Sequence, residues 1–304
     1  MGRPKNSKNK EKLSQEQINE LIKLYIDERV PIYKLEKMFK TKKIKDYITN
    51  SGNQLRNFRD AKRLYPFNEH YFDTIDTKDK AYFLGFLYAD GCVRKGTNGQ
   101  FHFKLSLKDE EPIVLFRKYL QSNKPIGVYK NSSKSYSQST LYQIDYSSKI
   151  TYDALVKWGC VENKTFLLKF PTFLHESLIP HFIRGYFDGD GTVFICNSIN
   201  KKRNELNNLP PNKQIYCGFS GTFDFLYGLL QALKVDWKVL YKDKRKSTDC
   251  WQIRISSNCR SKIIYDYLYK DCDDLFLKRK KDIFDNFFKE KGSETIIANP
   301  KIKD

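Results

Sequence analysis

The 304-residue sequence predicts an α+β protein in which two similar halves follow a small, wholly helical N-terminal module. Three observations lead to this prediction. A motif occurs twice, at 83–91 and 183–191. After each copy, apolar residues change from a helical period to the two-residue alternation of a strand. The order αββαββα can then be traced twice. We therefore expect two pseudo-symmetric repeats around a central two-helix interface, with one continuous antiparallel β-saddle.

Changes in composition divide the chain. The predicted parts are a disordered basic arm (1–12), a helix-turn-helix-like DNA-binding module (13–60), a linker (61–76), the first repeat (77–170), the second repeat (171–291) and a tail (292–304). In the arm, Gly2-Arg3-Pro4-Lys5 is similar to the core of an AT-hook, which lies in a minor groove. A plain solvated arm explains the same residues.

The N-terminal module shows three short apolar stripes at helical spacing. Ser14 and Gln17 form a capping box before the first, the second begins near Pro31, and the third covers 42–50. The third exposes three lysines, Lys42, Lys43 and Lys45. These would suit a recognition helix in a major groove, although a helical bundle with surface lysines is the alternative.

The two repeats contain matching elements. In the first, Thr77 precedes the motif helix that begins at Lys78. Its further elements are a helix at 110–120, a hairpin ending at 142–146 and a helix at 151–158. The second repeat has a strand at 214–220, a helix at 223–233, a hairpin ending at 251–255, a helix at 261–269 and a final amphipathic helix at 278–289. Gln-Ile followed by Ser-Ser occurs in both hairpins, which supports the repeat.

One face of the predicted strands is polar and basic. Along 101–108, apolar residues alternate with His102, Lys104, Ser106 and Lys108. A half-buried antiparallel strand explains the alternation by itself. Because a major groove admits a two-stranded ribbon, these residues are also candidates for contact with double-stranded DNA. In the second half, the candidates are Gln252 and Arg254.

The charge of the chain points to a polyanionic partner. Lys and Arg number 55 against 36 Asp and Glu, which gives a net charge of +19. A membrane surface is the competing polyanion, but no apolar stretch approaches the ~18 residues that span a bilayer, and no signal peptide is recognisable. We expect a soluble protein, not secreted, in a bacterial or phage-infected cytoplasm or in an organelle. Seven cysteines without a Cys-x-x-Cys pair argue against zinc and disulfides.

The two motif copies suggest a cation site. Gly85 with Ala89, and Gly185 with Gly189, each fall one turn apart, so two helix backbones could touch there. Each copy ends in Asp-Gly, at Asp90 and Asp190, where we expect the glycine in the left-handed conformation that stops a helix. A carboxylate at the negative end of a helix dipole is unfavourable for stability and suits a divalent cation. Packing of the two helices would bring the acids together.

These motifs resemble those of the LAGLIDADG homing endonucleases, in their single-chain, two-motif form, over about residues 66–290. The sequence departs from the pattern at four positions, namely Phe83, Ile183, Arg184 and Tyr88. The resemblance implies a monomeric DNA endonuclease that cuts both strands with staggered 3′ overhangs. It also implies Mg²⁺, or Mn²⁺, held by Asp90, Asp190 and the carbonyls of Ala89 and Gly189.

Basic residues are expected beside such a site to steady the phosphate. We choose Lys149 and Arg260, which lie at matching places after the Ser-Ser pairs, and Lys164 is a weaker candidate. A surface role is the alternative for each.

Two other functions are compatible with parts of the sequence. A non-cleaving relative of the same fold could act as an RNA-splicing maturase or a DNA-binding regulator, although both acids are present. An intein would need a nucleophile and a terminal Asn, which Met1 and the ending Pro300-Lys301-Ile302-Lys303-Asp304 do not provide.

Overall fold

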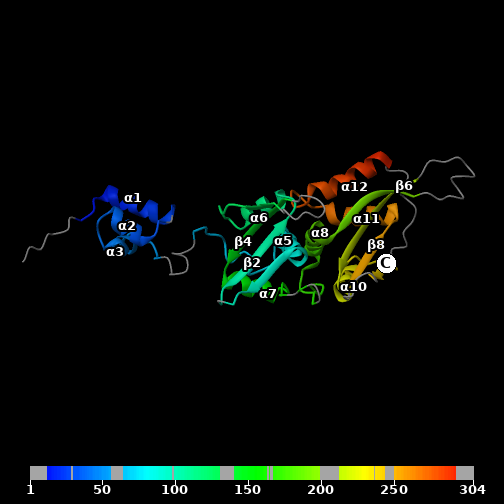
Figure 1. Ribbon diagram of the computed structural model, residues 1–304, viewed down its shortest axis with the longest axis horizontal. Helices are drawn as coiled ribbons and strands as arrows, with labels where there is room; N and C mark the ends of the chain where they lie inside the picture. The colour runs from blue at the N-terminus through cyan, green and yellow to red at the C-terminus, as the bar shows by residue number, and fades with distance from the viewer. Residues whose placement is uncertain are drawn as a thin grey trace, which may run out of the picture. The chain divides into compact units, whose positions relative to one another are not determined.

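The computed structural model forms two compact units, Met1–Pro66 and Phe67–Asp304 (Figure 1). The structure describes residues 12–28, 30–55, 64–97, 99–130, 140–162, 164, 167–198, 212–235, 237–243 and 250–291. The candidate AT-hook and the predicted tail lie outside these residues.

The first unit consists of the three predicted helices, α1 (Gln15–Ile26), α2 (Ile32–Met38) and α3 (Ile44–Asn50). The capping box is present: Gln17 N donates to Ser14 Oγ over 3.2 Å, and Ser14 N donates to Gln17 Oε1 over 3.0 Å. The helices bury a small core of their own, made of Leu21, Tyr25, Leu35, Ile44 and Ile48.

The second unit contains the order αββαββα twice, as predicted. The first repeat is α5 (Lys78–Ala89), β1 (Gly91–Lys95), β2 (Phe101–Leu107), α6 (Glu111–Tyr119), β3 (Gly127–Lys130), β4 (Thr140–Ser147) and α7 (Lys149–Lys157). The second repeat is α8 (Ile179–Asp190), β5 (Thr192–Ser198), β6 (Asn212–Gly221), α10 (Phe223–Ala232), β7 (Leu240–Lys242), β8 (Trp251–Ile255) and α11 (Asn258–Tyr269), and α12 (Lys278–Lys291) follows.

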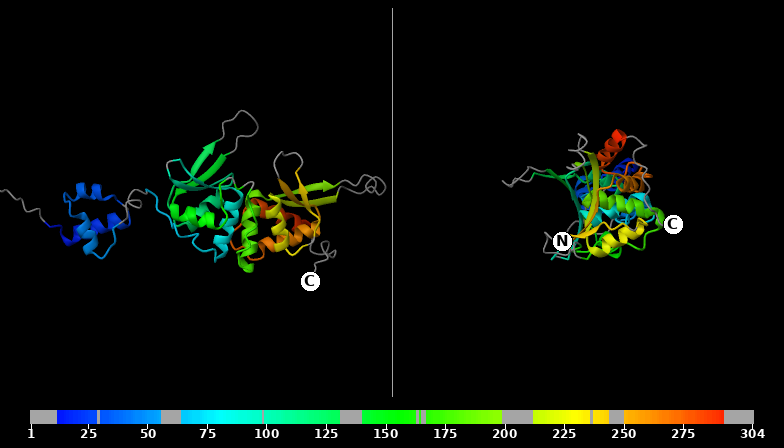
Figure 2. Two further views of the ribbon diagram at one scale, coloured as in Figure 1. Left: turned by 90° about the horizontal axis from the view of Figure 1, so that it is seen from below. Right: turned by 90° about the vertical axis from the view of Figure 1, so that its right-hand side faces the viewer.

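The strands form two sheets with the same order, β1-β2-β4-β3 and β5-β6-β8-β7, and every pairing is antiparallel. The α+β class and the two repeats are therefore confirmed. The expectation of one continuous saddle is wrong, because the described strands make no hydrogen-bonded pairing between the sheets. In the left view of Figure 2, the strands of both halves lie on one side and the helices beneath them.

The halves are joined by α5 and α8, whose glycines let the backbones touch. A Cβ added at Gly85 would lie 2.1 Å from the Phe182 carbonyl oxygen, and one at Gly185 would lie 1.9 Å from that of Tyr82. Both positions are closer than any side-chain carbon can approach, so the small-residue faces predicted from the sequence meet each other.

The glycines after the two acids have another role than the one expected. Gly191 has φ −75° and ψ 153°, and neither it nor Gly91 is left-handed. A Cβ would lie 2.6 Å from the Leu87 oxygen at Gly91, and 2.3 Å from the Phe187 oxygen at Gly191. Glycine is needed because each strand leaves close against the last helical turn.

Part of the predicted linker belongs to the second unit. Tyr71 and Phe72 are buried in its core. The Phe72 carbonyl accepts from Trp158 Nε1 over 2.7 Å, and the Glu69 carbonyl accepts from Thr151 Oγ1 over 2.9 Å. The lack of a periodic apolar pattern predicts a linker here, but the Phe67 ring packs on Phe103 and Tyr146 of the first sheet and the Phe72 ring on Phe116 of α6.

Candidate active site

The two motif acids occupy equivalent places at the ends of the central helices. Asp90 follows the last residue of α5 as its C-cap, and Asp190 is the last residue of α8. A Cβ added at Gly189 would lie 3.0 Å from Asp90 Oδ2, so the Asp90 carboxylate reaches over the partner helix. Both side chains remain open to solvent. The structure thus brings together the two acids that the sequence singled out.

The surroundings of Asp90 make its ionised form less favourable. Its pKa is raised to about 6, first because the nearby protein displaces water and second because Asp190 adds a negative charge. Lys164, Lys280 and Arg279 act in the opposite direction. A cation between the two acids would relieve the same repulsion.

Lys280, in α12, binds the end of α8. Its side chain is buried, and Nζ donates to the carbonyls of Phe187 over 2.6 Å, Gly189 over 3.1 Å and Gly191 over 2.5 Å. Burial lowers the pKa of Lys280 to about 8, so it is still mostly protonated at neutral pH. The Phe187 carbonyl also accepts from Gly191 N over 2.8 Å. The ammonium group therefore adds a second donor at Phe187 and supplies one to the carbonyls of Gly189 and Gly191 at the end of the helix.

Lys164 has the corresponding role at the end of α5. Its Nζ donates to the Leu87 carbonyl over 2.5 Å, and burial lowers its pKa. Each lysine lies beyond the last helix of its repeat, Lys164 after α7 and Lys280 after α11. Sequence reasoning ranked Lys164 low and missed Lys280, although this shared position is a signal that could have found both. Together they offset the unfavourable meeting of two carboxylates with two helix dipoles.

Lys149 and Arg260, the cations preferred from the sequence, make other contacts. Lys149 pairs with Asp153 on α7 and lies 5.4 Å from the centre of the Phe101 ring. Arg260 lies 5.2 Å from the centre of the Trp237 ring. The cations with the largest effect on Asp90 are instead Lys164, Lys280 and Arg279. The two residues occupy matching positions in the repeats, but these positions are at the starts of α7 and α11 rather than at the C-terminal ends of α5 and α8.

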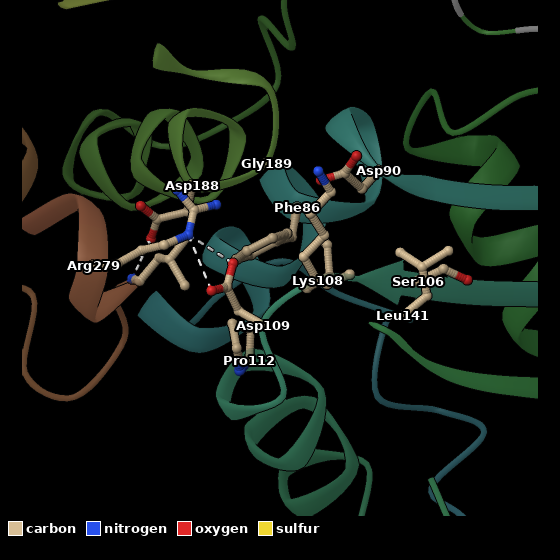
Figure 3. Close-up of a pocket in the computed structure, with 12 residues that line it drawn as sticks. Phe86, Asp90, Ser106, Lys108, Asp109, Pro112, Leu141, Asp188, Gly189 and Arg279 are labelled. Carbon is tan, nitrogen blue, oxygen red and sulfur yellow. Dashed lines mark hydrogen bonds and ion pairs between the residues drawn. The ribbon is translucent and has the colours of Figure 1, made fainter. Parts of the chain in front are cut away.

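A cavity of about 330 Å³ opens beside Asp90. Its lining includes Gly189, Arg279 and the end of the first sheet from Ser106 to Asp109. Arg279 Nε bonds both carboxylate oxygens of Asp109, over 3.0 and 2.9 Å (Figure 3). This bond connects α12 of the second half with the loop after β2 of the first. Lys108, one of the predicted DNA contacts, also lines the cavity.

Asp188 also lines this cavity, but its contacts are structural. One carboxylate oxygen, Oδ2, accepts from Tyr82 Oη over 2.9 Å and from Leu277 N over 2.8 Å. Burial raises the pKa of Asp188 to about 6. In the first half the same motif position holds Tyr88, which donates to the Trp158 carbonyl over 2.5 Å. The departure between the motif copies therefore concerns packing against different neighbours.

The predicted DNA contacts lie on the outer faces of the two sheets. In β2, Phe103, Leu105 and Leu107 are buried, and the alternate positions His102, Lys104 and Ser106 face outward. In β8, Arg254 is exposed, whereas Gln252 has both ends of its amide engaged. Gln252 is thus better described as a residue that holds Arg254. In the first unit, Lys42, Lys43 and Lys45 are exposed around the start of α3.

The donor set at the helix ends fits a hard divalent cation. Two carboxylates and main-chain carbonyls are the oxygen ligands that Mg²⁺ and Mn²⁺ prefer. The Gly189 carbonyl already accepts from Lys280, which leaves it one lone pair, and Ala89 stays a predicted ligand. Among the described residues, no group of three or more His, Cys, Asp or Glu side chains is arranged to hold a metal.

Comparison with known proteins found similar solved structures. No family model and no curated protein matches the sequence. The chain is similar to LAGLIDADG endonucleases. The meganuclease I-AabMI, bound to uncleaved DNA, is 15% identical with a TM-score of 0.43, and the match covers 71% of this chain and 92% of that one. The homing endonuclease I-LtrWI, bound to target DNA, is 15% identical with a TM-score of 0.45, over 75% and 92%.

A third similar structure is the homing endonuclease I-WcaI bound to its DNA recognition sequence, with 12% identity, a TM-score of 0.45 and coverage of 71% and 91%. Likeness at this level concerns the arrangement of the elements and says nothing about the reaction of this chain. Within the described residues, no helix is both long enough and apolar enough to span a bilayer.

Proposed function

We propose that the chain is a homing endonuclease that hydrolyses one phosphodiester on each strand of double-stranded DNA at a specific site and leaves staggered 3′ overhangs. The observation that carries the proposal is the convergence of Asp90 and Asp190 where α5 and α8 touch, with a lysine bound to the carbonyls of each helix end. Two equivalent acids in one chain suit two antiparallel strands, so the protein acts as a monomer. It would work in a bacterial or phage-infected cytoplasm or in an organelle.

Asp90 and Asp190, with the carbonyls of Ala89 and Gly189, would hold Mg²⁺ or Mn²⁺. The cation supplies activation of a water molecule and neutralises charge on the leaving oxygen. The chain itself orients the acids through the glycine contact of α5 and α8. Lys164 and Lys280 fix the helix ends and lower the cost of ionising Asp90. Lys108 and Arg279, beside the cavity, add positive charge where a phosphate would approach.

The outer faces of the sheets would position the duplex. They carry outward-facing cations on both halves, including Arg94 and Lys104 in the first sheet and Arg254 in the second. Phosphate contacts from such residues set affinity, and contacts with base edges set the sequence that is cut. The three-helix N-terminal module extends the bound site through Lys42, Lys43 and Lys45.

The proposal is tested with a pool of supercoiled plasmids that carry a long randomised insert. Incubation with the protein and Mg²⁺ should linearise a subset, and sequencing of the new ends should show 3′ overhangs. Asp90→Asn and Asp190→Asn should each lower double-strand cleavage on the order of 100-fold or more, because a metal ligand matters at least as much as its supporting partners. Gel-shift affinity should change only a few-fold.

Asp153→Asn is the matched control, since this carboxylate is exposed and pairs with Lys149 on the surface of α7. It should cut like the unaltered protein. Full cutting by either motif variant, or undiminished cutting in a chelator, would contradict the proposal.

A further inference from the structure

The outer faces of the two sheets present different chemistry at matching positions. Residues that are paired across neighbouring strands can be compared between the sheets, starting at the ends of α5 and α8. The first such set is Cys92, Lys104 and Asp145 in the first sheet and Thr192, Gly218 and Arg254 in the second. Two residues further along β1 and β5, the set is Arg94, His102 and Ser147 in the first sheet, and Phe194 and Tyr216 in the second. The first sheet is thus charged and polar at places where the second carries an aromatic pair.

The aromatic pair of the second sheet is exposed on a surface strand. The rings of Phe194 and Tyr216 stack with centroids 4.7 Å apart and planes 26° apart, and Phe194 is 44% exposed. In contrast, His102 of the first sheet is held by polar neighbours, with Nδ1 2.9 Å from Ser147 Oγ and Nε2 3.1 Å from Gln100 Oε1.

A hollow lies beside this pair. A Cβ at Gly218 would lie 2.5 Å from the Ile253 oxygen and 3.3 Å from Tyr216 Oη, so the absence of a side chain at this position lets the Tyr216 ring lie close over the strand. The open cavity, of about 470 Å³, is lined by Thr192, Phe194, Tyr216 and Arg254, among others. Its wall is therefore aromatic on one side and cationic on the other.

The cationic wall is held in place by its neighbours. Arg254 Nε donates to Gln252 Oε1 over 3.0 Å, and Gln252 Nε2 donates to Asp243 Oδ2 over 3.0 Å. The guanidinium also lies 5.8 Å from the centre of the Tyr241 ring. Because Arg254 Nε is hydrogen-bonded to Gln252, the two terminal nitrogens of the Arg254 guanidinium are the donors left for a ligand. They complement the acceptor atoms of a purine edge in a major groove.

We propose that Phe194 and Tyr216 recognise the 5-methyl group of a thymine in the major groove of one half of the DNA target, an inference that rests on the proposed function. Among the groups that base pairs expose in that groove, the thymine methyl is the one that an apolar surface distinguishes. Arg254 supplies the polar contact beside it. The first sheet offers no such pair at the matching positions, so recognition of the methyl belongs to the second half alone.

An unpaired base stacked flat on Phe194 is the competing occupant. It would gain little from a methyl group at its edge. Replacing thymine by uracil removes this methyl and keeps the base pairing, so it separates the two possibilities without altering the protein.

The experiment uses full-length protein with Asp90→Asn and Asp190→Asn, which keeps the DNA intact. Duplexes selected from a randomised pool define the bound sequence, and footprints of variants in each sheet assign its halves. Uracil is then substituted for thymine in one half at a time. We expect affinity to fall about fourfold for each contacted methyl in the half bound by the second sheet, and less than about twofold in the other half.

Phe194→Ala in the same protein should abolish this preference for thymine. Tyr129→Ala, at an exposed aromatic residue of β3, is the matched control and should retain it. Equal affinity for thymine and uracil duplexes, an undiminished preference in Phe194→Ala, or tighter binding of single strands than duplexes would each overturn the inference. Failure to bind any duplex would overturn the proposed function as well, whereas a selected duplex that is indifferent to the methyl overturns the inference alone.

Discussion

The ends of α5 and α8 closely match each other, whereas the outer faces of the two sheets differ. Each helix end carries an aspartate, a sterically required glycine and a lysine on its last carbonyls. The sheets have the same strand order but opposite charges at Asp145 and Arg254, which follow the same Gln-Ile pair. Under the proposed function, this difference has a simple reason. The two DNA strands present the same phosphodiester to the centre, whereas the two halves of the target present different base pairs to the two sheets.

The match at the centre is close but incomplete. Within the described residues, Lys280 donates to three carbonyls at the end of α8, whereas Lys164 donates to a single carbonyl at the end of α5. Asp188 stands where the first half has Tyr88. Matching substitutions, one in each half, can show which residues at the ends of α5 and α8 contribute equally and which do not.

The largest effect is expected at the helix contact. Gly85→Val and Gly185→Val should each lower the free energy of unfolding by about 1–3 kcal/mol or more, because the new side chain meets backbone that cannot move aside. Urea denaturation measures this loss. Gly96→Ala is the control, since its added carbon would have no neighbour closer than 3.5 Å. An unchanged stability in either valine variant would show that the glycines do not face each other.

The lysines behind the helix ends should differ in their contribution to stability. Lys280→Met removes the ammonium donor from three carbonyls, of which Phe187 keeps its bond from Gly191 N, and should cost about 2 kcal/mol. Lys164→Met removes one such bond and should cost about 1 kcal/mol. Lys278→Met, which removes an exposed pair with Asp282 on the same helix as Lys280, should cost less than about 1 kcal/mol. Equal losses at Lys280 and Lys164 would mean that the two ends are equivalent.

Cleavage should depend on the protonation of Asp90. Since its pKa is raised to about 6, the acid increasingly binds a proton below that pH and loses its affinity for a cation. At limiting Mg²⁺, the cleavage rate should fall about tenfold for each pH unit below about 6. More Mg²⁺ should move the midpoint to lower pH, because cation and proton compete. A rate that is flat from pH 7 to 5 at limiting Mg²⁺ would exclude Asp90 as the titrating ligand.

The sign of the shift also has a consequence for the metal-free protein. A raised pKa means that folded Asp90 holds its proton more tightly than the unfolded chain does. Its contribution to stability therefore declines as the pH rises from about 4 to about 6. Asp90→Asn should remove that part of the pH dependence.

The smallest effect is expected from the N-terminal module. Deleting residues 1–60 should weaken DNA binding and shorten the footprint on one flank, with cutting retained at higher protein concentration. Each lost phosphate contact should flatten the plot of log affinity against log salt by about 0.9. Replacing Lys42, Lys43 and Lys45 by Gln should reproduce part of the change without removing the module. An unaltered salt slope after the deletion would show that the module does not touch DNA.

The sequence alone determined the features that depend on local periodicity and local sterics. The sequence predicts the two motif helices, the alternation in β2, the capping box at Ser14 and the contact between the helix faces that carry Gly85 and Gly185. These features depend on the order of side chains within one element, or on a motif that occurs twice. For the same reason, Asp90 and Asp190 could be expected to lie together.

Only the tertiary structure decided which other side chains join them. Lys280 and Lys164 bind carbonyls up to 93 and 77 residues away, and no local pattern indicates such contacts. The engagement of Gln252, the burial of Phe72 and the separation into two sheets likewise depend on which elements pack against each other. A helix or strand can be read from a dozen neighbouring residues, but the partner of a buried charge is set by the whole core.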